Sequence, residues 1–127
     1  MKITELPKTE VLTKKDFLDN MIAYYSEDPA HRRATNGEGA CSYHRDDGNR
    51  CAVGRWIPDE MYTSGMEGVS VGDHFVFSRL PEKLKNLGED FLTDIQGLHD
   101  GDRFWNSNGL SPAGEKRVAS IRRDHNC

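Results

Sequence analysis

Apolar side chains recur at helical spacing in three segments of the chain, and this periodicity constrains the fold more than any other sequence feature. In residues 14–26 and 88–98 the recurring residues are Phe17, Leu18, Met21, Ile22, Tyr25, Phe91, Leu92, Ile95 and Leu98. In residues 112–125, Val118 and Ile121 lie on one face, opposite Lys116, Arg117, Arg122 and Arg123. Each segment therefore predicts an amphipathic helix whose apolar face contributes to a core.

Helix start signals agree with this pattern. Thr13 precedes Asp16 by three residues, which is close to a capping box, and Ser111 precedes Pro112 at the start of the last helix. Asp28-Pro29 predicts a further short helix that runs to about Arg33. We also expect short helices after Pro58 and over residues 81–87, and a short strand over residues 74–77.

Residues 40–44 and 50–54 flank a turn signal, Asp46-Asp47-Gly48-Asn49. Because Gly48 accepts a positive φ at no steric cost, these runs predict a β-hairpin. A two-residue turn places His44 opposite Cys51 and Tyr43 opposite Ala52, whereas a loop one residue longer shifts both pairs. The sequence leaves the register open. The glycine-rich residues 64–74 read as a surface loop.

The expected fold class is therefore α+β, with about three main helices packed on a short antiparallel hairpin or sheet. Residues 1–12 are expected to form an extended lead-in, and residues 13–127 a single domain. The net charge of −4 argues against binding along an extended nucleic acid. Because the chain lacks an apolar run of about 18 residues and an N-terminal signal sequence, we expect a cytoplasmic protein without a membrane partner.

The chain has three cysteines, Cys41, Cys51 and Cys127. An odd number of cysteines without a secretion signal is typical of a reducing compartment. Cys41 and Cys51 could meet across the predicted hairpin as a disulfide. Two thiols that pack as small apolar groups are the favoured alternative.

Two blocks of the sequence, CSYHRDDGNRCAVGRWIPDEMYTSGMEG and FLTDIQGLHD, resemble a family of small, mostly uncharacterised proteins of bacteriophages, prophages and their hosts. The matching positions are Cys41, Tyr43, Gly48, residues 51–54, residues 57–60, Tyr62, residues 66–68, Phe91, Leu92, Gln96, His99 and Asp100. The chain departs from the family pattern at His44, where arginine is expected, and at Ile95, where leucine is expected. The resemblance implies a phage-related protein that acts in the cytoplasm, and it implies no catalytic residue.

Three sets of side chains have the residue types of a reactive site. Cys41, His44 and Cys51 could bind zinc with a fourth ligand from His31, His99 or His125, but side-chain alternation places Cys41 and His44 on opposite faces of a hairpin. Cys51, His44 and Asp46 have the residue types of a cysteine nucleophile, its base and an orienting acid. His99-Asp100 with His74 could belong to a metal-dependent phosphohydrolase. The ordinary alternatives are a buried structural cysteine and a helix C-terminus, so we expect no cofactor, no metal and no catalytic residue.

Arginine is concentrated in residues 31–55. This segment has five arginines and three acidic residues, a net charge of +2 in an acidic chain; the arginines are Arg32, Arg33, Arg45, Arg50 and Arg55. Guanidinium groups bind phosphate or carboxylate in a planar, bidentate way. Tyr43 and Trp56, with Tyr24 and Tyr25 just upstream, could offer ring faces for stacking.

These features predict a phage-type accessory protein that sequesters a small anionic, nucleotide-derived ligand, such as a host immune signal. The residues expected to bind it are Arg45, Arg50 and Arg55, which contact the anion, Tyr43 and Trp56, which stack, and His44, Gly48 and Gly54. A homo-oligomer could build the pocket between subunits. The alternatives are an inhibitor that covers a host protein with its acidic face and a metal-dependent phosphohydrolase.

Overall fold

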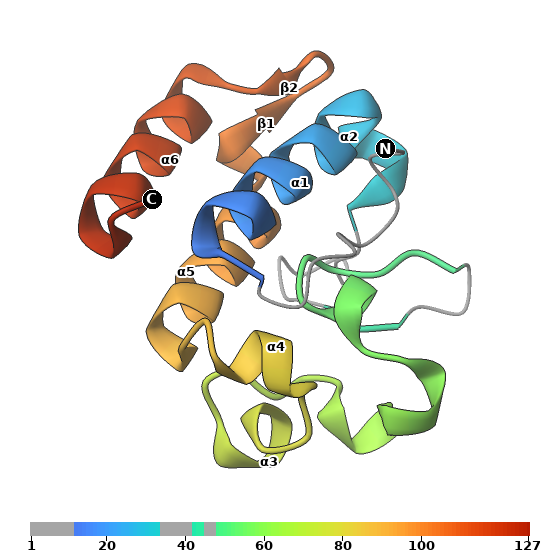
Figure 1. Ribbon diagram of the computed structural model, residues 1–127. Helices are drawn as coiled ribbons and strands as arrows, with labels where there is room; N and C mark the ends of the chain where they lie inside the picture. The colour runs from blue at the N-terminus through green and yellow to red at the C-terminus, as the bar shows by residue number, and fades with distance from the viewer. Residues whose placement is uncertain (1–11, 34–41, 45–47) are drawn as a thin grey trace.

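Figure 1 shows the computed structural model, which describes residues 12–33, 42–44 and 48–127. Three long helices dominate it: α1 (Lys14–Glu27), α5 (Glu89–Asp100) and α6 (Pro112–His125). The shorter helices are α2 (Pro29–Arg32), α3 (His74–Phe77) and α4 (Glu82–Lys85), and the 3-10 turns are η1 (Gly54–Trp56), η2 (Asp59–Met61), η3 (Ser64–Met66) and η4 (Asp102–Phe104). With an antiparallel sheet of β1 (Trp105–Asn106) and β2 (Gly109–Leu110), this is the predicted α+β class.

The predicted helix starts are confirmed. The Thr13 hydroxyl accepts a hydrogen bond of 3.0 Å from the amide of Asp16, and the Ser111 hydroxyl accepts one of 3.1 Å from the amide of Gly114. Each bond supplies an acceptor for an amide that the helix itself leaves without one. None of the helices within the described ranges is both long and apolar enough to span a bilayer.

The predicted hairpin is wrong in its described part, because residues 42–44 and 50–54 form no strand; residues 40, 41 and 45–47 of this prediction lie outside the described residues. The sheet pairs Trp105 with Leu110, so the hairpin lies around residues 106–109, which the sequence indicated only as a turn. In the earlier region, the amide of Cys51 donates to the carbonyl of Ser42, not of His44, and the chain then turns into η1. The Glu67 carboxylate accepts hydrogen bonds from the amides of Tyr43 and His44, so neither of these bonds belongs to a strand ladder.

Residues 74–77 also differ from the prediction, because they form the helix α3 and not a strand. Asp73 caps this helix, and its carboxylate accepts a hydrogen bond of 2.9 Å from the amide of Phe75. A local cap of this kind favours the helical turn over an extended segment that has no neighbouring strand.

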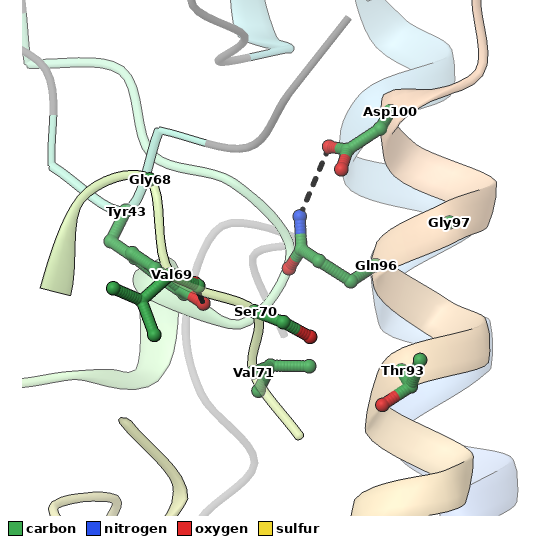
Figure 2. Close-up of a pocket in the computed structure, with 9 residues that line it drawn as sticks. All are labelled: Tyr43, Gly68, Val69, Ser70, Val71, Thr93, Gln96, Gly97 and Asp100. Carbon is green, nitrogen blue, oxygen red and sulfur yellow. Dashed lines mark hydrogen bonds between the residues drawn. The ribbon is translucent and has the colours of Figure 1, made fainter. Parts of the chain in front are cut away.

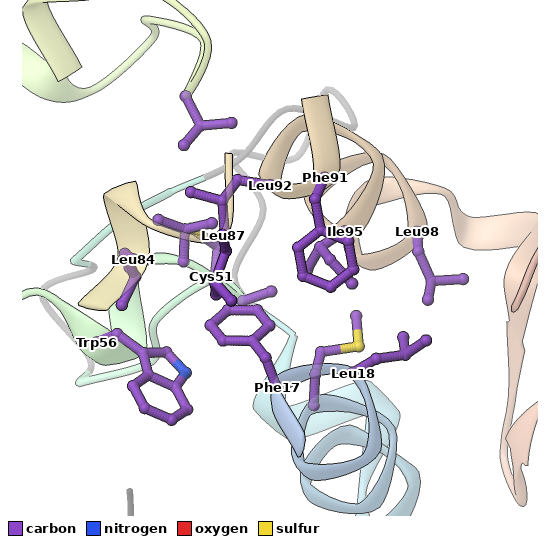
Figure 3. Close-up of a cluster of buried hydrophobic side chains, with 14 of the residues drawn as sticks. Phe17, Leu18, Cys51, Trp56, Leu84, Leu87, Phe91, Leu92, Ile95 and Leu98 are labelled. Carbon is purple, nitrogen blue, oxygen red and sulfur yellow. The ribbon is translucent and has the colours of Figure 1, made fainter. Parts of the chain in front are cut away.

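The core lies where α1 and α5 meet the segment around η1 (Figure 3). The ring of Phe17 on α1 lies 5.0 Å from that of Trp56 and 6.1 Å from that of Phe91 on α5. Two arginines that the sequence placed on the outer face of α6 make ion pairs to neighbouring helices. Arg117 bonds Asp94 on α5 at 3.1 Å, and Arg122 bonds Asp19 on α1 at 2.6 Å.

Candidate functional site

Tyr43 and Trp56 belong to the core, and this corrects their predicted role as stacking surfaces. Their exposed fractions are 0% and 4%. Trp56 packs against Phe17, and the Tyr43 hydroxyl donates to the carbonyl of Val69 at 2.7 Å. Trp56 therefore offers no ring face to a ligand, and Tyr43 is a core residue that borders a cavity described below.

The arginines of residues 31–55 do not converge on one cradle within the described part of the chain. Arg50 pairs with Asp59 at 2.7 Å. Arg33 binds Asp102 at 2.9 Å and also donates to the carbonyls of His99 and Asp100. Arg33 thus fastens α2 to the end of α5. Arg45, which was expected to contact the anion, lies outside the described residues.

Arg32 and Arg55 do meet at an aromatic ring, which is that of Tyr24. Their guanidinium carbons lie 4.5 Å and 3.8 Å from the ring centroid. Arg55 also donates to the side-chain oxygen of Asn20 at 3.1 Å. Burial lowers the pKa of Arg55, and the charge of Arg32 lowers it further. The positively charged guanidinium groups of Arg32 and Arg55 thus both contact the half-buried ring of Tyr24.

His44 and Gly54 contact backbone atoms in this structure, and Gly48 allows a turn of the backbone. His44 Nε2 lies 3.1 Å from the carbonyl oxygens of both Gly54 and Ile57, and its ring stacks on Tyr62 at 4.2 Å. Gly54 allows the backbone of Tyr43 to approach closely, whereas the sequence predicted that a ligand would approach the backbone there. Gly48 has the positive φ expected of it, +91°, and lies in open space.

The described residues do not form the metal site or the cysteine site that were the alternatives to a binding protein. No three His, Cys, Asp or Glu side chains among those residues are placed to hold a metal ion. Cys51 is completely buried, as the structural alternative expected. Cys41 and Asp46, on which the disulfide, zinc and nucleophile alternatives also depend, lie outside the described residues.

A pocket of about 290 Å³ lies between α5 and residues 68–71 (Figure 2). Its lining consists of Tyr43, Gly68, Val69, Ser70, Val71, Thr93, Gln96, Gly97 and Asp100. The four residues from α5 recur at helical spacing, so they share one face of the helix. Of the predicted ligand-binding residues, Tyr43 alone contributes to this described lining. The size is close to the lower limit of small-molecule sites, roughly 300 Å³.

A hydrogen-bond network organises the polar edge of the pocket. The Gln96 oxygen accepts from the amide of Val53 at 3.2 Å. The Gln96 amide nitrogen donates to Asp100 Oδ1 at 3.1 Å, and Figure 2 shows this second bond as a dashed line. His99 Nδ1 donates to the same Oδ1 at 2.7 Å. No described residue donates to Asp100 Oδ2. This oxygen is therefore the acceptor that a bound molecule could use.

His99 lies behind the pocket with an exposed fraction of 0%. Burial lowers its pKa from the ordinary value of 6.5, and this outweighs the opposing effect of the hydrogen bond to Asp100. Its imidazole is therefore neutral near pH 7, with Nδ1 protonated and donating to the carboxylate.

The lowered pKa of His99 predicts a loss of stability in mild acid. Below pH 6.5 the unfolded chain takes up a proton that the folded protein does not, so the free energy of unfolding falls by up to about 1.4 kcal/mol per pH unit. Urea titrations between pH 7.5 and 5 should show a smaller slope in His99→Gln. His31→Gln is the control, because the His31 side chain is 82% exposed. Equal slopes in the wild type and His99→Gln would contradict this prediction.

Thr93 and Gly97 did not stand out in the sequence. Gly97 interrupts a helix interior, where glycine is unfavourable, and with Thr93 it places two small residues one turn apart on the face opposite the apolar one. This combination is the signal that could have indicated a cavity. Gln96 and Asp100 did stand out, but as members of a family motif and of a metal site.

Comparisons with protein-family models, curated proteins and solved structures found no match to this chain. The site therefore has to be interpreted from its own geometry.

Proposed function

We propose that this chain is a binding protein without catalytic chemistry, whose pocket between α5 and residues 68–71 takes the heterocyclic part of a small, nucleotide-like ligand. The observation that carries the proposal is Asp100 Oδ2, a carboxylate acceptor at the edge of a pocket with valine and glycine walls. Small-molecule sites commonly combine apolar walls with a few placed polar groups. In the described lining, no hydroxyl is hydrogen-bonded to a histidine, so the geometry favours binding over nucleophilic catalysis.

The biological role in this proposal combines the phage-related origin that the sequence resemblance implies with the anion-binding potential of the arginine-rich segment. A phage-type accessory protein would sequester a nucleotide-derived signal of its host by holding the signal's base in this pocket. The described lining contains no cation, so an anionic group of the ligand would have to be bound elsewhere. Arg32, which lies at the Tyr24 ring and pairs with Glu27 at 3.0 Å, would exchange this carboxylate for the anionic group of the ligand.

Calorimetric titration of the wild-type chain tests the proposal with the four ribonucleosides and their 5′-monophosphates as probes. We expect saturable binding, with a rise in melting temperature as the probe concentration exceeds the dissociation constant. Thr93→Phe should fill the pocket and weaken binding by about tenfold or more, because a ring in the cavity displaces the ligand. Lys116→Phe, which adds the same ring at an exposed position of α6, is the control.

The same titration separates the two parts of the proposal. If the monophosphates bind more tightly than the nucleosides, and Arg32→Gln removes the difference, the anionic group lies at the Tyr24 ring. If none of the eight probes binds to the wild type, the proposed function is wrong. Equal weakening by Thr93→Phe and Lys116→Phe would place the ligand outside this pocket.

A further inference from the structure

We infer that the pocket selects planar heterocycles that carry an exocyclic amino group, and that Asp100 recognises this group. The selectivity rests on the proposed function and adds the chemical class of ligand to it. It follows from the fixed orientation of the Asp100 carboxylate and from the absence of a side chain at Gly97.

The Asp100 carboxylate is held in one orientation. Its Oδ1 accepts hydrogen bonds from Gln96 Nε2 at 3.1 Å and from His99 Nδ1 at 2.7 Å. Gln96 cannot exchange its oxygen and nitrogen without losing the amide of Val53, which donates to its oxygen. Because an ionised carboxylate only accepts hydrogen bonds, Oδ2 calls for a donor on the ligand. A ligand carbonyl at the same place would meet a second acceptor and be repelled.

The backbone at Gly97 supplies a surface for a flat group. A Cβ built on Gly97 would meet no heavy atom within 4 Å, so contacts within the described protein give no reason for a glycine there. Glycine inside a helix lowers its stability relative to alanine. Figure 2 shows Val69 and Val71 on the segment that faces this side of α5. A planar ring can therefore lie on the bare helix backbone, between it and the segment of residues 68–71.

Two pairs of nucleosides isolate the amino group. Guanosine differs from inosine by one amino group, and cytidine carries an amino group where uridine carries a carbonyl. For the wild type, we expect the amino-bearing member of at least one pair to bind about tenfold more tightly, because a hydrogen bond to a charged group is lost in the other. Isothermal titration calorimetry with these four probes measures the ratio.

The decisive variant is Asp100→Asn. The asparagine oxygen can still accept from His99 and Gln96, while its NH₂ replaces Oδ2 and presents a donor to the ligand. The preference should then fall below about threefold or reverse in favour of inosine or uridine. Asp102→Asn is the matched control, since it removes the same charge two residues away, from an exposed carboxylate that does not line the pocket. It should keep the wild-type preference.

Gly97→Ala provides a second test that does not depend on Asp100. The added methyl group should raise the melting temperature by about 4 °C through helix propensity and weaken guanosine binding by about tenfold. Unchanged guanosine affinity in this variant would overturn the placement of the ring on Gly97. If Asp100→Asn loses its helical circular dichroism, two other measurements decide the inference. These are the guanosine affinity of Gly97→Ala and the preference of the wild type within the two nucleoside pairs.

The outcomes distinguish this inference from the function on which it rests. Binding of nucleosides with equal affinity within both pairs would overturn the inference and leave the proposed function standing. An unchanged preference in a folded Asp100→Asn variant would also overturn it. If no nucleoside or nucleotide binds to the wild type, the proposed function and the inference are both wrong.

Discussion

Replacing Gly54 with alanine is expected to destabilise the protein by about 4 kcal/mol, which is most of the stability of a domain at the lower end of the usual range, about 5 kcal/mol. A Cβ at this position would lie 2.1 Å from the carbonyl oxygen of Tyr43 and 2.8 Å from its carbonyl carbon and Cα. All three atoms belong to the backbone of Tyr43, so no side-chain rotation relieves the overlap. The segments must separate, and the buried Tyr43 ring must move with them.

Urea denaturation followed by circular dichroism measures this loss. Gly97→Ala is the matched control, because it adds the same methyl group where no heavy atom lies within 4 Å. We expect that variant to be more stable than the wild type by about 1 kcal/mol, the usual difference between glycine and alanine in a helix. If the free energy of unfolding of Gly54→Ala lies within about 1 kcal/mol of the wild-type value, the close approach of Gly54 and Tyr43 is not a feature of the folded protein.

Glu67→Ala is expected to destabilise the protein by about 3 kcal/mol. The Glu67 carboxylate accepts 3.0 Å hydrogen bonds from the amides of Tyr43 and His44 and a 2.6 Å bond from the Tyr62 hydroxyl. Removing it leaves these three donors without that acceptor, and Tyr43 is completely buried. An amide left unsatisfied in the interior loses its solvation without gaining a partner.

The effect of Glu67→Ala should also reach the pocket, because Tyr43 and Val69 line it and are joined by a hydrogen bond. The midpoint of urea denaturation measures the stability. Glu60→Ala is the control, since it removes an exposed carboxylate from the same segment and should change stability by less than about 0.5 kcal/mol. Equal midpoints for the two variants would show that the Glu67 carboxylate does not stabilise the fold.

The three long helices could be predicted because their signals are local. Apolar residues at helical spacing and capping hydroxyls at Thr13 and Ser111 act within a few residues of one another. The strands could not be placed in the same way. The amides of Tyr43 and His44 bind a carboxylate 24 and 23 residues further along the chain, and no local pattern reveals that competitor for a strand partner.

The candidate site shows the same division. The arginine-rich segment suggested Tyr43 and Trp56 as ligand surfaces, yet both rings are buried, and the ring near two of the arginines is that of Tyr24. The pocket combines one face of α5 with a segment more than twenty residues earlier in the sequence. Composition identifies aromatic and cationic side chains, but it does not say which ones the core covers.

The amino-acid sequence by itself determined the α+β class, the starts of α1 and α6 and the apolar faces of the long helices, because these depend on interactions between residues close in the chain. Only the tertiary structure decided which rings are buried, which carboxylate each guanidinium group contacts and where a cavity remains. These outcomes depend on which distant segments pack together, and packing between them sets side-chain direction, burial and the space left beside Gly97.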